Sequence, residues 1–374
     1  MTKARENSDY TGLQGDLAGL QTNITAGDTA ARAGRKNLII NGAMQVSQRG
    51  TTMSNSGANS SYHTLDRWQT HGSGGTYNLS QQTMTAGTSN QAGGCSKFAR
   101  FSVITGDNNL GLRQCIEDVE SIPAGYTVAV SFYAKGTAGK VIGTFIQSIF
   151  GTGGSTSMSH AGSISEHTLT TSWTRYTSTF TMPSDYLTGK TIGANSFNRL
   201  QFRQPEADTS TTAWVLDVTG VQLEVGSVAT DFEHRSYGEI LADCQRYFYN
   251  PLYNLGGSRG QFTLDYLVSS GNNGWITWIV PFPVSMRANS TFSHSLTPAK
   301  FLGSAAPADG ADNFSFYIQN QGYAGLVGNG SIANLGGGGQ YHGIVGTYYC
   351  SPSSTSASHI FIGNGCTFQF SAEL

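Results

Sequence analysis

The sequence predicts an all-β protein: a jelly-roll β-sandwich followed by a second, smaller C-terminal β-sandwich, with a short N-terminal helical, coiled-coil-like anchor. Two observations support this class. Charged residues make up only 12% of the 374 residues, whereas glycine occupies 48 positions. Short apolar or alternating runs also recur at close intervals, separated by stretches rich in Gly, Asn, Ser and Pro. Both features are typical of a turn-rich β protein.

Residues 1–36 differ from the rest of the chain. Their apolar residues recur at spacings of three and four, as in two heptads of a coiled coil. These residues are Tyr10, Leu13, Leu17, Leu20 and Ile24. Interspersed glycines each cost about 1 kcal/mol of helix propensity, and so short a helix is marginal in water. We therefore expect an anchoring helix that forms when several copies or a docking surface bury its apolar side; the alternative is a disordered tail.

Residues 37–236 carry the strands of the predicted jelly roll. The longest, Ala213–Val225, alternates bulky residues with small or polar ones, as a half-buried strand does. Nine or ten short strands without intervening helices predict a two-sheet sandwich. The predicted strands are Asn37–Ile40, Leu65–His71, Thr76–Met84, Lys97–Ile104, Gly111–Val119, Thr127–Ala134, Lys140–Phe150, Ser172–Met182, Arg199–Arg203 and Ala213–Val225.

A change of periodicity follows the sandwich. The apolar residues of 237–250 fall on one face of a helix, which predicts a helical hinge. The segment 251–374 then returns to β patterning and forms the second body. Its predicted strands are Gln261–Val268, Gly274–Pro283, Phe314–Gln319, Tyr341–Cys350, His359–Ile362 and Cys366–Ala372.

The C-terminal body contains the predicted ligand-binding residues. Alternation in Gly274–Pro283 places Ile276, Trp278, Val280 and Phe282 on one apolar face and turns Trp275 to the other. The Gln321–Gly343 stretch has nine glycines and is predicted to be a functional loop or an exposed tip. The predicted ligand-binding residues are Trp275, Tyr323, Tyr341 and His342. The alternative is that these aromatic residues are buried between subunits.

Charge and cysteine usage exclude several classes of function. The formal net charge of −2 and the lack of a basic patch give no reason to expect nucleic acid as a partner. No apolar run reaches the ~20 residues that span a bilayer, so no membrane insertion is expected; the polar N-terminus does not read as a signal peptide. The five cysteines are Cys95, Cys115, Cys244, Cys350 and Cys366. Their wide spacing indicates buried thiols of a protein made in a reducing cytosol rather than a metal site.

Catalytic motifs are not found, and no cofactor is predicted. Glycan hydrolysis needs two facing carboxylates, but Glu117, Asp118 and Glu120 crowd one segment. Asp217 and Glu224 are seven apart, which puts them on opposite faces of a regular strand. The chain also has no Gly-x-Ser-x-Gly, His-Glu-x-x-His or P-loop motif. We therefore predict that it is not an enzyme.

Four residues allow both a chemical and a packing role. His234 lies between Glu233 and Arg235, as in an acid–base cluster, but packing and hydrogen bonding are the favoured interpretation. Trp68 is a candidate sugar-stacking platform. The favoured interpretation places it in the core, alternating with Asp66 on one face of a strand. Trp173 and Trp214 are interpreted in the same way.

Several motifs together resemble those of a known family. They are Gln222–Gly226 (Gln-Leu-Glu-Val-Gly), Phe232–Glu239 (Phe-Glu-His-Arg-Ser-Tyr-Gly-Glu), Cys244–Phe248 (Cys-Gln-Arg-Tyr-Phe), Asn37–Gly50 and Leu65–Trp68. Taken in their order along the chain, over about residues 37 to 250, they resemble tail-fibre and related appendage proteins of bacteriophages. The resemblance implies a virion protein, made in the host cytoplasm, that forms a homotrimer. It also implies docking to other tail or head proteins through the N-terminus and attachment to a host cell-surface glycan or protein.

A second resemblance concerns the fold. The Ser-Phe-Tyr-Ala-Lys strand ending at Lys135 and the Ser-Trp-Thr-Arg-Tyr strand starting at Ser172 are similar to strands of carbohydrate-binding jelly-roll modules. Such modules often hold a structural Ca²⁺, and Asp217 lies on the last strand of the sandwich. A single carboxylate is weak support for such a site.

Three functions remain open at this stage. The leading one is a non-enzymatic virion appendage, a tail fibre or similar projection, that binds a host glycan. The alternatives are a glycan depolymerase or other hydrolase on the tail, and a purely structural head or tail decoration protein.

Overall fold

The computed structural model describes most of the chain from residue 35 to 251 and shorter segments after it. The described residues are 35–56, 61–72, 74–106, 110–160, 165–205, 208, 211–251, 260–262, 274–288, 291–294, 315–318, 325–326, 331–335, 341–351, 358–362 and 368–374. The predicted anchoring residues Tyr10, Leu13, Leu17, Leu20 and Ile24 lie outside this set. The chain divides into two compact units, Met1–Ile240 with Leu374, and Leu241–Glu373.

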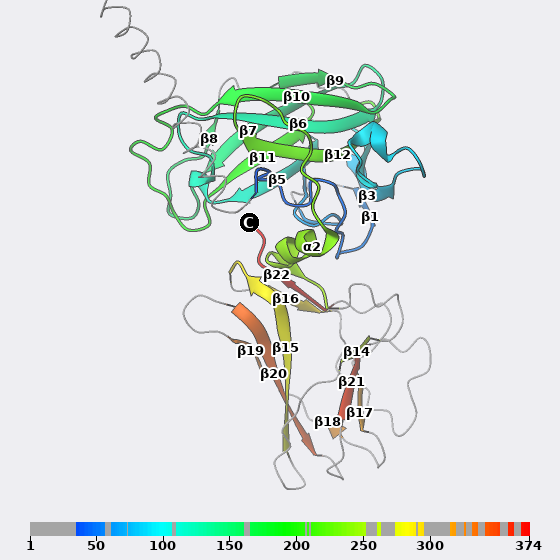
Figure 1. Cartoon of the computed structure of the whole chain (residues 1–374). Helices are drawn as coiled ribbons and strands as arrows, with labels where there is room; N and C mark the ends of the chain where they lie inside the picture. Colours follow the sequence, from blue (N-terminus) through cyan, green and yellow to red (C-terminus); the bar gives the residue numbers. More distant parts are fainter. Residues whose placement is uncertain are drawn as a thin grey trace, which may run out of the picture. The chain divides into compact units, whose positions relative to one another are not determined.

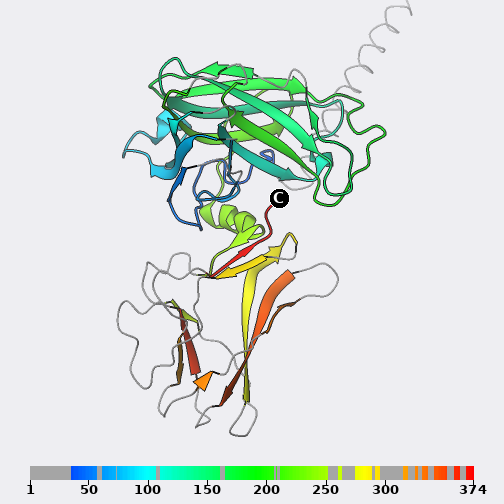
Figure 2. The ribbon, with the colours of Figure 1, turned by 180° about the vertical axis from the view of Figure 1, so that it is seen from behind.

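The first unit is a sandwich of two antiparallel sheets, visible as two layers of strands in both ribbon views (Figures 1 and 2). Sheet A has the strand order β1-β3-β4-β12-β6-β10. Its strands are β1 (Thr52–Ser56), β3 (Thr76–Thr83), β4 (Lys97–Thr105), β12 (Trp214–Val225), β6 (Thr127–Gly136) and β10 (Thr174–Thr181). The predicted all-β class and jelly-roll sandwich are confirmed.

Sheet B forms the second layer, in the order β2-β5-β11-β7-β8, with β9 beside β7. Its strands are β2 (Gln69–His71), β5 (Gly111–Glu117), β11 (Phe197–Arg203), β7 (Val141–Ile149), β8 (Met158–Ser159) and β9 (Ser165–Thr168). Two short 3₁₀ helices, η1 (Ser89–Ala92) and η2 (Val119–Ser121), lie in the connections. The core fills the space between the sheets with alternate side chains such as Leu79, Phe101, Phe132, Leu200 and Phe202.

A β-bulge interrupts the alternation of β12. The register against β6 shifts between Thr219 and Gln222, and Gly220 has a φ of 59°, which glycine adopts without steric cost. Core residues are therefore even-numbered before the bulge and odd-numbered after it, as Val218 and Val221 show. The extra residue keeps one face of this long strand apolar along its whole length.

The segment before the first strand is bound to the end of β12. The side chain of Asn37 accepts a hydrogen bond from Leu223 N at 3.1 Å and donates one to Val221 O at 3.1 Å. Leu38 N donates to Leu223 O at 2.8 Å, and Asn37 N donates to Glu233 Oε2 at 2.9 Å. The first motif of the phage resemblance, Asn37–Gly50, therefore meets the Gln222–Gly226 and Phe232–Glu239 motifs in one corner of the sandwich.

Two predicted strands in this region are wrong. Asn37–Ile40 is not a strand, and of Leu65–His71 only Gln69–His71 is one. Asn41 and Arg67 have φ angles of 58° and 70°, which an extended strand does not allow. Strands β1, β8 and β9 were not predicted.

Helix α2 (Tyr237–Gln245) lies where the sequence predicts a helical segment. Its start carries a capping box. Ser236 N donates to Glu239 Oε2 at 3.0 Å, and Glu239 N donates to Ser236 Oγ at 3.4 Å. The boundary between the two compact units falls within this helix.

After the end of α2, the second unit consists of strands and connections in its described part and contains three antiparallel sheets. The first is β13 (Phe248–Tyr249), β22 (Phe368–Ser371) and β16 (Thr291–His294), and the second is β14 (Gly260–Phe262), β21 (Ser358–Ile362) and β17 (Ser315–Ile318). The third pairs β20 (Tyr341–Ser351) with β15 (Gly274–Met286), β18 (Gly325–Leu326) and β19 (Ser331–Leu335). Phe282, Tyr249 and Phe370 pack together, with ring centroids 5.1 to 6.2 Å apart.

The Gly-rich stretch Gln321–Gly343 is not one continuous loop. It contains β18 and β19, which both pair with β20. Glycine content therefore overstated the length of this loop, because backbone pairing needs no side chain. Strands β13, β16, β18 and β19 were not predicted, and β13 lies within the segment 237–250 that was predicted to be helical.

Candidate functional site

The ligand-binding residues predicted in the second unit are not brought together by its backbone. Trp275 pairs with Tyr349 in the β15–β20 ladder, whereas Tyr341 pairs with Met286. At about 3.3 Å per residue, Trp275 lies roughly 25 Å along the ladder from Tyr341 and from the adjacent His342. Tyr323 lies outside the described residues. A binding role for these residues stays a prediction.

A row of three charged residues crosses the outer face of sheet A, the face turned away from the core. Asp217 of β12 pairs with Arg100 of β4 on one side and with Lys135 of β6 on the other. The alternating pattern of these strands turns their neighbours Leu216, Phe101 and Ala134 into the core. The three charged side chains therefore share the outer face.

The carboxylate of Asp217 is the centre of this row. Arg100 Nε donates to Oδ1 at 2.7 Å and Arg100 NH2 donates to Oδ2 at 2.8 Å. Lys135 Nζ lies 4.0 Å from Oδ2. The Asp217 side chain is 3% exposed, but those of Arg100 and Lys135 are 41% and 30% exposed. Hydrogen bonding to Asp217 raises the pKa of Arg100. The solvent-exposed part of the row thus consists of the two cationic side chains, with the anion buried between them.

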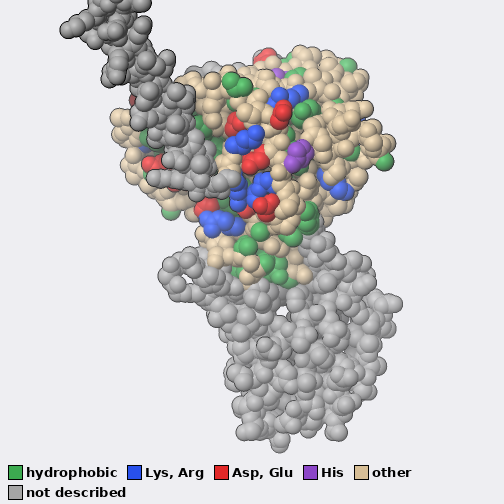
Figure 3. Space-filling view, in the orientation of Figure 1, with side chains coloured by type: hydrophobic (Ala, Val, Ile, Leu, Met, Phe, Trp, Pro, Cys, Tyr) green, Lys and Arg blue, Asp and Glu red, His purple; other side chains and the backbone are tan. Residues whose placement is uncertain are grey.

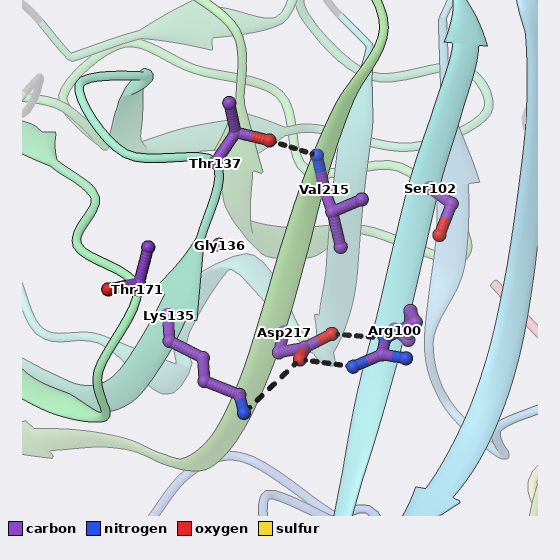
Figure 4. A pocket seen from close by; sticks show the side chains of 8 residues that line it. All are labelled: Arg100, Ser102, Lys135, Gly136, Thr137, Thr171, Val215 and Asp217. Carbon is purple, nitrogen blue, oxygen red and sulfur yellow. Dashed lines mark hydrogen bonds and ion pairs between the residues drawn. The ribbon is translucent and has the colours of Figure 1, made fainter.

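The row forms the floor of a shallow depression of about 420 Å³. Figure 4 shows Arg100 and Lys135 pointing toward Asp217 from the strands on either side. The lining residues are Arg100, Ser102, Lys135, Gly136, Thr137, Thr171, Val215 and Asp217. Six of these eight residues carry a hydroxyl or a charged group, so the depression offers both donors and acceptors to a polar ligand.

Trp173 does not line this depression but lies next to Lys135, which does. Its half-buried ring lies outside the main core, in a small cluster with Met84, Ala92 and Phe98. Lys135 Nζ is 5.2 Å from its ring centroid. The favoured packing interpretation is confirmed in part: Trp173 packs against Phe98, with ring centroids 5.3 Å apart, but in this small cluster and not in the core between the sheets. Trp173 directly precedes β10. In β10 the even-numbered Tyr176 packs against the core, so the alternation of side chains places odd-numbered residues, and Trp173 with them, on the outer face.

On one face of the first unit, charges of opposite sign lie next to one another (Figure 3). On the face shown in Figure 3, Lys and Arg side chains lie next to Asp and Glu side chains in a band. This arrangement fits the formal net charge of −2 and gives no large basic field for a nucleic acid. In the described part of the chain, no helix is long and apolar enough to cross a membrane.

Asp217 does not suit a structural Ca²⁺. Both of its carboxylate oxygens accept hydrogen bonds from Arg100, and Lys135 stands on the other side. Calcium needs six to eight oxygen ligands, and cations surround this carboxylate instead. Among the described residues, no group of three or more His, Cys, Asp or Glu could hold a metal ion.

Asp217 and Glu224 lie on the same face of β12, contrary to the sequence interpretation. The bulge at Gly220 adds one residue and reverses the alternation between them. They are nevertheless about 20 Å apart along the strand, whereas paired glycosidase carboxylates lie about 5 to 10 Å apart. Glu224 also accepts hydrogen bonds from Gln222 Nε2 and from Thr230 N and Oγ1. The two carboxylates do not form a catalytic pair.

The other ambiguous residues have packing roles. Trp68 is fully buried and donates from Nε1 to Asn41 O at 3.1 Å, although the Asp66–Trp68 segment is a turn and not a strand. Trp214 is 3% exposed and belongs to the core. His234 Nε2 is hydrogen-bonded to Gly93 O at 2.7 Å, and its ring packs at 87° on Phe232.

The described cysteines agree with the predicted buried thiols. Cys95, Cys115 and Cys244 are buried and free. Burial raises the pKa of Cys95 to about 11, which keeps this thiol protonated and unreactive at neutral pH.

Comparisons with known proteins find a likeness in solved structures only. No protein family model matches the sequence, and no curated protein matches it. The N-terminal cellulose-binding domain from Cellulomonas fimi β-1,4-glucanase C is 16% identical, with a TM-score of 0.28, over 40% of this chain and 90% of that domain. A family 11 carbohydrate-binding module from Clostridium thermocellum, in complex with a mixed-linked tetrasaccharide, is 12% identical, with a TM-score of 0.25, over 48% of this chain and 98% of that module.

A phage protein is also among the similar structures. The enzymatically active domain of bacteriophage CBA120 tailspike protein 4 is 12% identical, with a TM-score of 0.32, over 51% of this chain and 22% of the tailspike chain. Because every one of these TM-scores is below 0.5, no function is transferred from these proteins.

Proposed function

We propose that this protein is a non-enzymatic component of a bacteriophage virion, a tail fibre or similar projection, which attaches to the host surface by binding a glycan. The observation that carries the glycan-binding part is the depression on sheet A. Its charged row supplies donors and acceptors for sugar hydroxyls, and the ring of Trp173 lies next to Lys135 of this row, 5.2 Å from its Nζ. Sugar recognition commonly combines such polar groups with an aromatic surface.

The charged row suits binding better than catalysis. Asp217 is held by Arg100 and cannot approach a second carboxylate on this face, because Glu224 is about 20 Å away. The lining residues Ser102, Thr137 and Thr171 add hydroxyl groups at the sides. A shallow, open site of this kind binds weakly, and several copies on one particle raise the avidity. The homotrimer and the docking of residues 1–36 on other virion proteins belong to this proposal.

The attachment role is supported by the order of the phage-like motifs. The Asn37–Gly50 segment and the end of β12 are far apart in sequence but share hydrogen bonds through Asn37, Val221 and Leu223. The motifs therefore close the sandwich at one corner. Trp275, Tyr323, Tyr341 and His342 remain candidates for a further contact.

A glycan array tests the proposal. We expect the full chain to bind a subset of bacterial surface glycans, and Trp173→Ala and Arg100→Gln each to weaken that binding at least tenfold. Thr179→Ala, an exposed change on the same sheet, is the matched control and should bind like the wild type. Circular dichroism checks that each variant is folded. An array without any bound glycan, or full binding by both variants, would overturn the proposed site.

A further inference from the structure

The outer face of sheet B carries a cluster of arginine and glutamine side chains. The register of β5, β11 and β7 aligns Arg113, Gln201 and Phe145 in one cross-strand row, and Cys115, Arg199 and Gln147 in the next. Gln69 of β2 extends the first row. Their neighbours Leu112, Leu200 and Ile146 point into the core. We call the residues Gln69, Arg113, Gln147, Arg199 and Gln201 the arginine face.

The hydrogen-bond partners of its two arginines are neutral. Arg113 Nε donates to Gln69 Oε1 at 2.5 Å, and Arg113 NH1 lies 3.0 Å from His71 Nδ1. Arg199 NH2 donates to Gln147 Oε1. No ion pair with a carboxylate is found for either arginine among the described residues, including Glu117, which lies opposite Phe197.

Two positive charges therefore share a partly desolvated surface, and no carboxylate of the described residues forms an ion pair with either of them. Arg113 is 7% exposed, whereas Arg199 is half-buried and opens the face to solvent. Burial and the charge of Arg199 lower the pKa of Arg113 to about 10, and burial also lowers the pKa of Arg199. Burial raises the pKa of the neighbouring Cys115 thiol, so it stays neutral at pH 7. Buried charges normally have a partner of opposite sign.

Two buried polar atoms on this face also lack hydrogen-bond partners. They are Arg199 Nε, a donor, and Gln201 Oε1, an acceptor. Gln201 is only 2% exposed, and its Nε2 lies 3.3 Å from Gln147 Oε1. An unsatisfied buried polar atom costs about 1 to 3 kcal/mol. A ligand that relieves both must therefore bring an acceptor to Arg199 and a donor to Gln201.

We propose that the arginine face binds the carboxylate of an acidic sugar. A planar carboxylate matches the forked donors of Arg113 and Arg199 and supplies the missing negative charge. A carboxylate alone has no donor for Gln201 Oε1, but a neighbouring sugar hydroxyl does. This site is distinct from the depression on sheet A, which faces the other side of the sandwich.

Binding of acidic oligosaccharides by the full chain tests this site. The probes are oligogalacturonate and oligosialate, each compared by calorimetry with its methyl ester, which is the same chain of sugars without the charge. We expect at least one acid to bind ten times or more tightly than its ester. Arg113→Gln and Arg199→Gln should each remove that difference while the variants stay folded, because both relieve a repulsion between like charges.

The controls separate this site from the one on sheet A. Lys97→Gln removes one positive charge from sheet A, away from the arginine face, and should leave the preference for the acid unchanged. Equal binding of acid and ester by the wild type would overturn the proposal, as would a preference that survives both arginine changes. A preference that is lost in Arg100→Gln and kept in Arg199→Gln would also overturn it, by moving the anion site to sheet A. Tighter binding of sulfated or phosphorylated sugars than of both acids would refute the assignment to a carboxylate.

Discussion

Gln48 donates two hydrogen bonds to the carboxylate of Asp66, one from its backbone N to Oδ1 at 3.0 Å and one from its side-chain Nε2 to Oδ2 at 2.5 Å. Asp66 is fully buried, and Arg49 NH1 lies 3.6 Å from Oδ1. Asp66 N in turn donates to Val46 O at 3.1 Å. This carboxylate thus joins the two segments that precede the main strands.

We expect Asp66→Ala to destabilise the sandwich by about 3–5 kcal/mol, because it leaves the buried donors of Gln48 and the charge of Arg49 without their acceptor. Chemical denaturation of both chains measures the difference. Asp185→Ala, at an exposed position, should change the free energy of unfolding by less than about 0.5 kcal/mol. Equal effects of the two changes would show that the pairing with Gln48 contributes little.

Acid should weaken the first unit through His71. Burial, followed by the charges of Arg113, Arg199 and Arg203, lowers the pKa of His71 from 6.5 to about 4. The unfolded chain therefore binds a proton in this range that the folded chain does not, so stability falls as the pH drops from about 6.5 to about 4.

The size of this effect follows from the shift and from solvent screening. The full shift corresponds to about 3 kcal/mol, and the partial exposure of His71 reduces it to about 1–2 kcal/mol. Denaturation at pH 7.5, 5.5 and 4.5 measures it. His71→Gln should flatten this part of the profile, and an unchanged slope would assign the loss to other groups.

The bulge of β12 should depend on glycine. A side chain at Gly220, where φ is 59°, would be strained, and a Cβ there would approach the Tyr133 ring to 3.0 Å. We expect Gly220→Val to cost about 1–3 kcal/mol. Gly238→Ala, in helix α2 with nothing within 4 Å, should instead stabilise by up to about 1 kcal/mol. Thermal unfolding of both variants checks the contrast.

The purified protein should not shorten glycans. Asp217 and Glu224 are the carboxylates that share the outer face of β12, and their separation of about 20 Å exceeds that of a hydrolytic pair. A reducing-sugar assay on every glycan that the protein binds measures this. Release of reducing ends that persists in the Asp217→Asn, Glu224→Gln double variant would reveal a catalytic centre elsewhere in the chain.

The assembly state should depend on residues 1–36. We expect the full chain to sediment as a homotrimer, because the apolar residues from Tyr10 to Ile24 are too few for a stable single helix. A chain that starts at Asn37 should form weaker trimers or none. Monomers in both cases, with normal incorporation of the shortened chain into virions, would contradict the anchoring role.

The fold class follows from the sequence because its strands are short, alternating and bounded by turn residues. The main strands of the sandwich, such as Thr76–Thr83 and Trp214–Val225, match their predicted bounds closely. The segments at Asn37 and Leu65 were misassigned since their apolar residues suggest strands, whereas positive φ angles at Asn41 and Arg67 make tight turns. Side-chain hydrogen bonds that join distant segments leave no local pattern.

The candidate sites were harder to predict than the fold. Alternation alone places Arg100 and Trp173 on the outer face of sheet A, a signal present in the sequence but outweighed by the usual burial of tryptophan. The pairing of Arg100 with Asp217 and Lys135 depends on strand order, which sequence spacing does not reveal. The same holds for Arg113 and Arg199, which become neighbours only through the register of β5 and β11.

The hydrogen bonds between Asn37 and the end of β12 have a mechanical consequence. The chain enters the sandwich at Asn37 and leaves it just after Val225. Hydrogen bonds from the segment at Asn37 to Val221 and Leu223 connect these two points directly. A pull applied to the chain on both sides of the unit therefore loads this short link first. Until the link breaks, the tension bypasses the strands in between, so both outer faces keep their shape on a protein under strain.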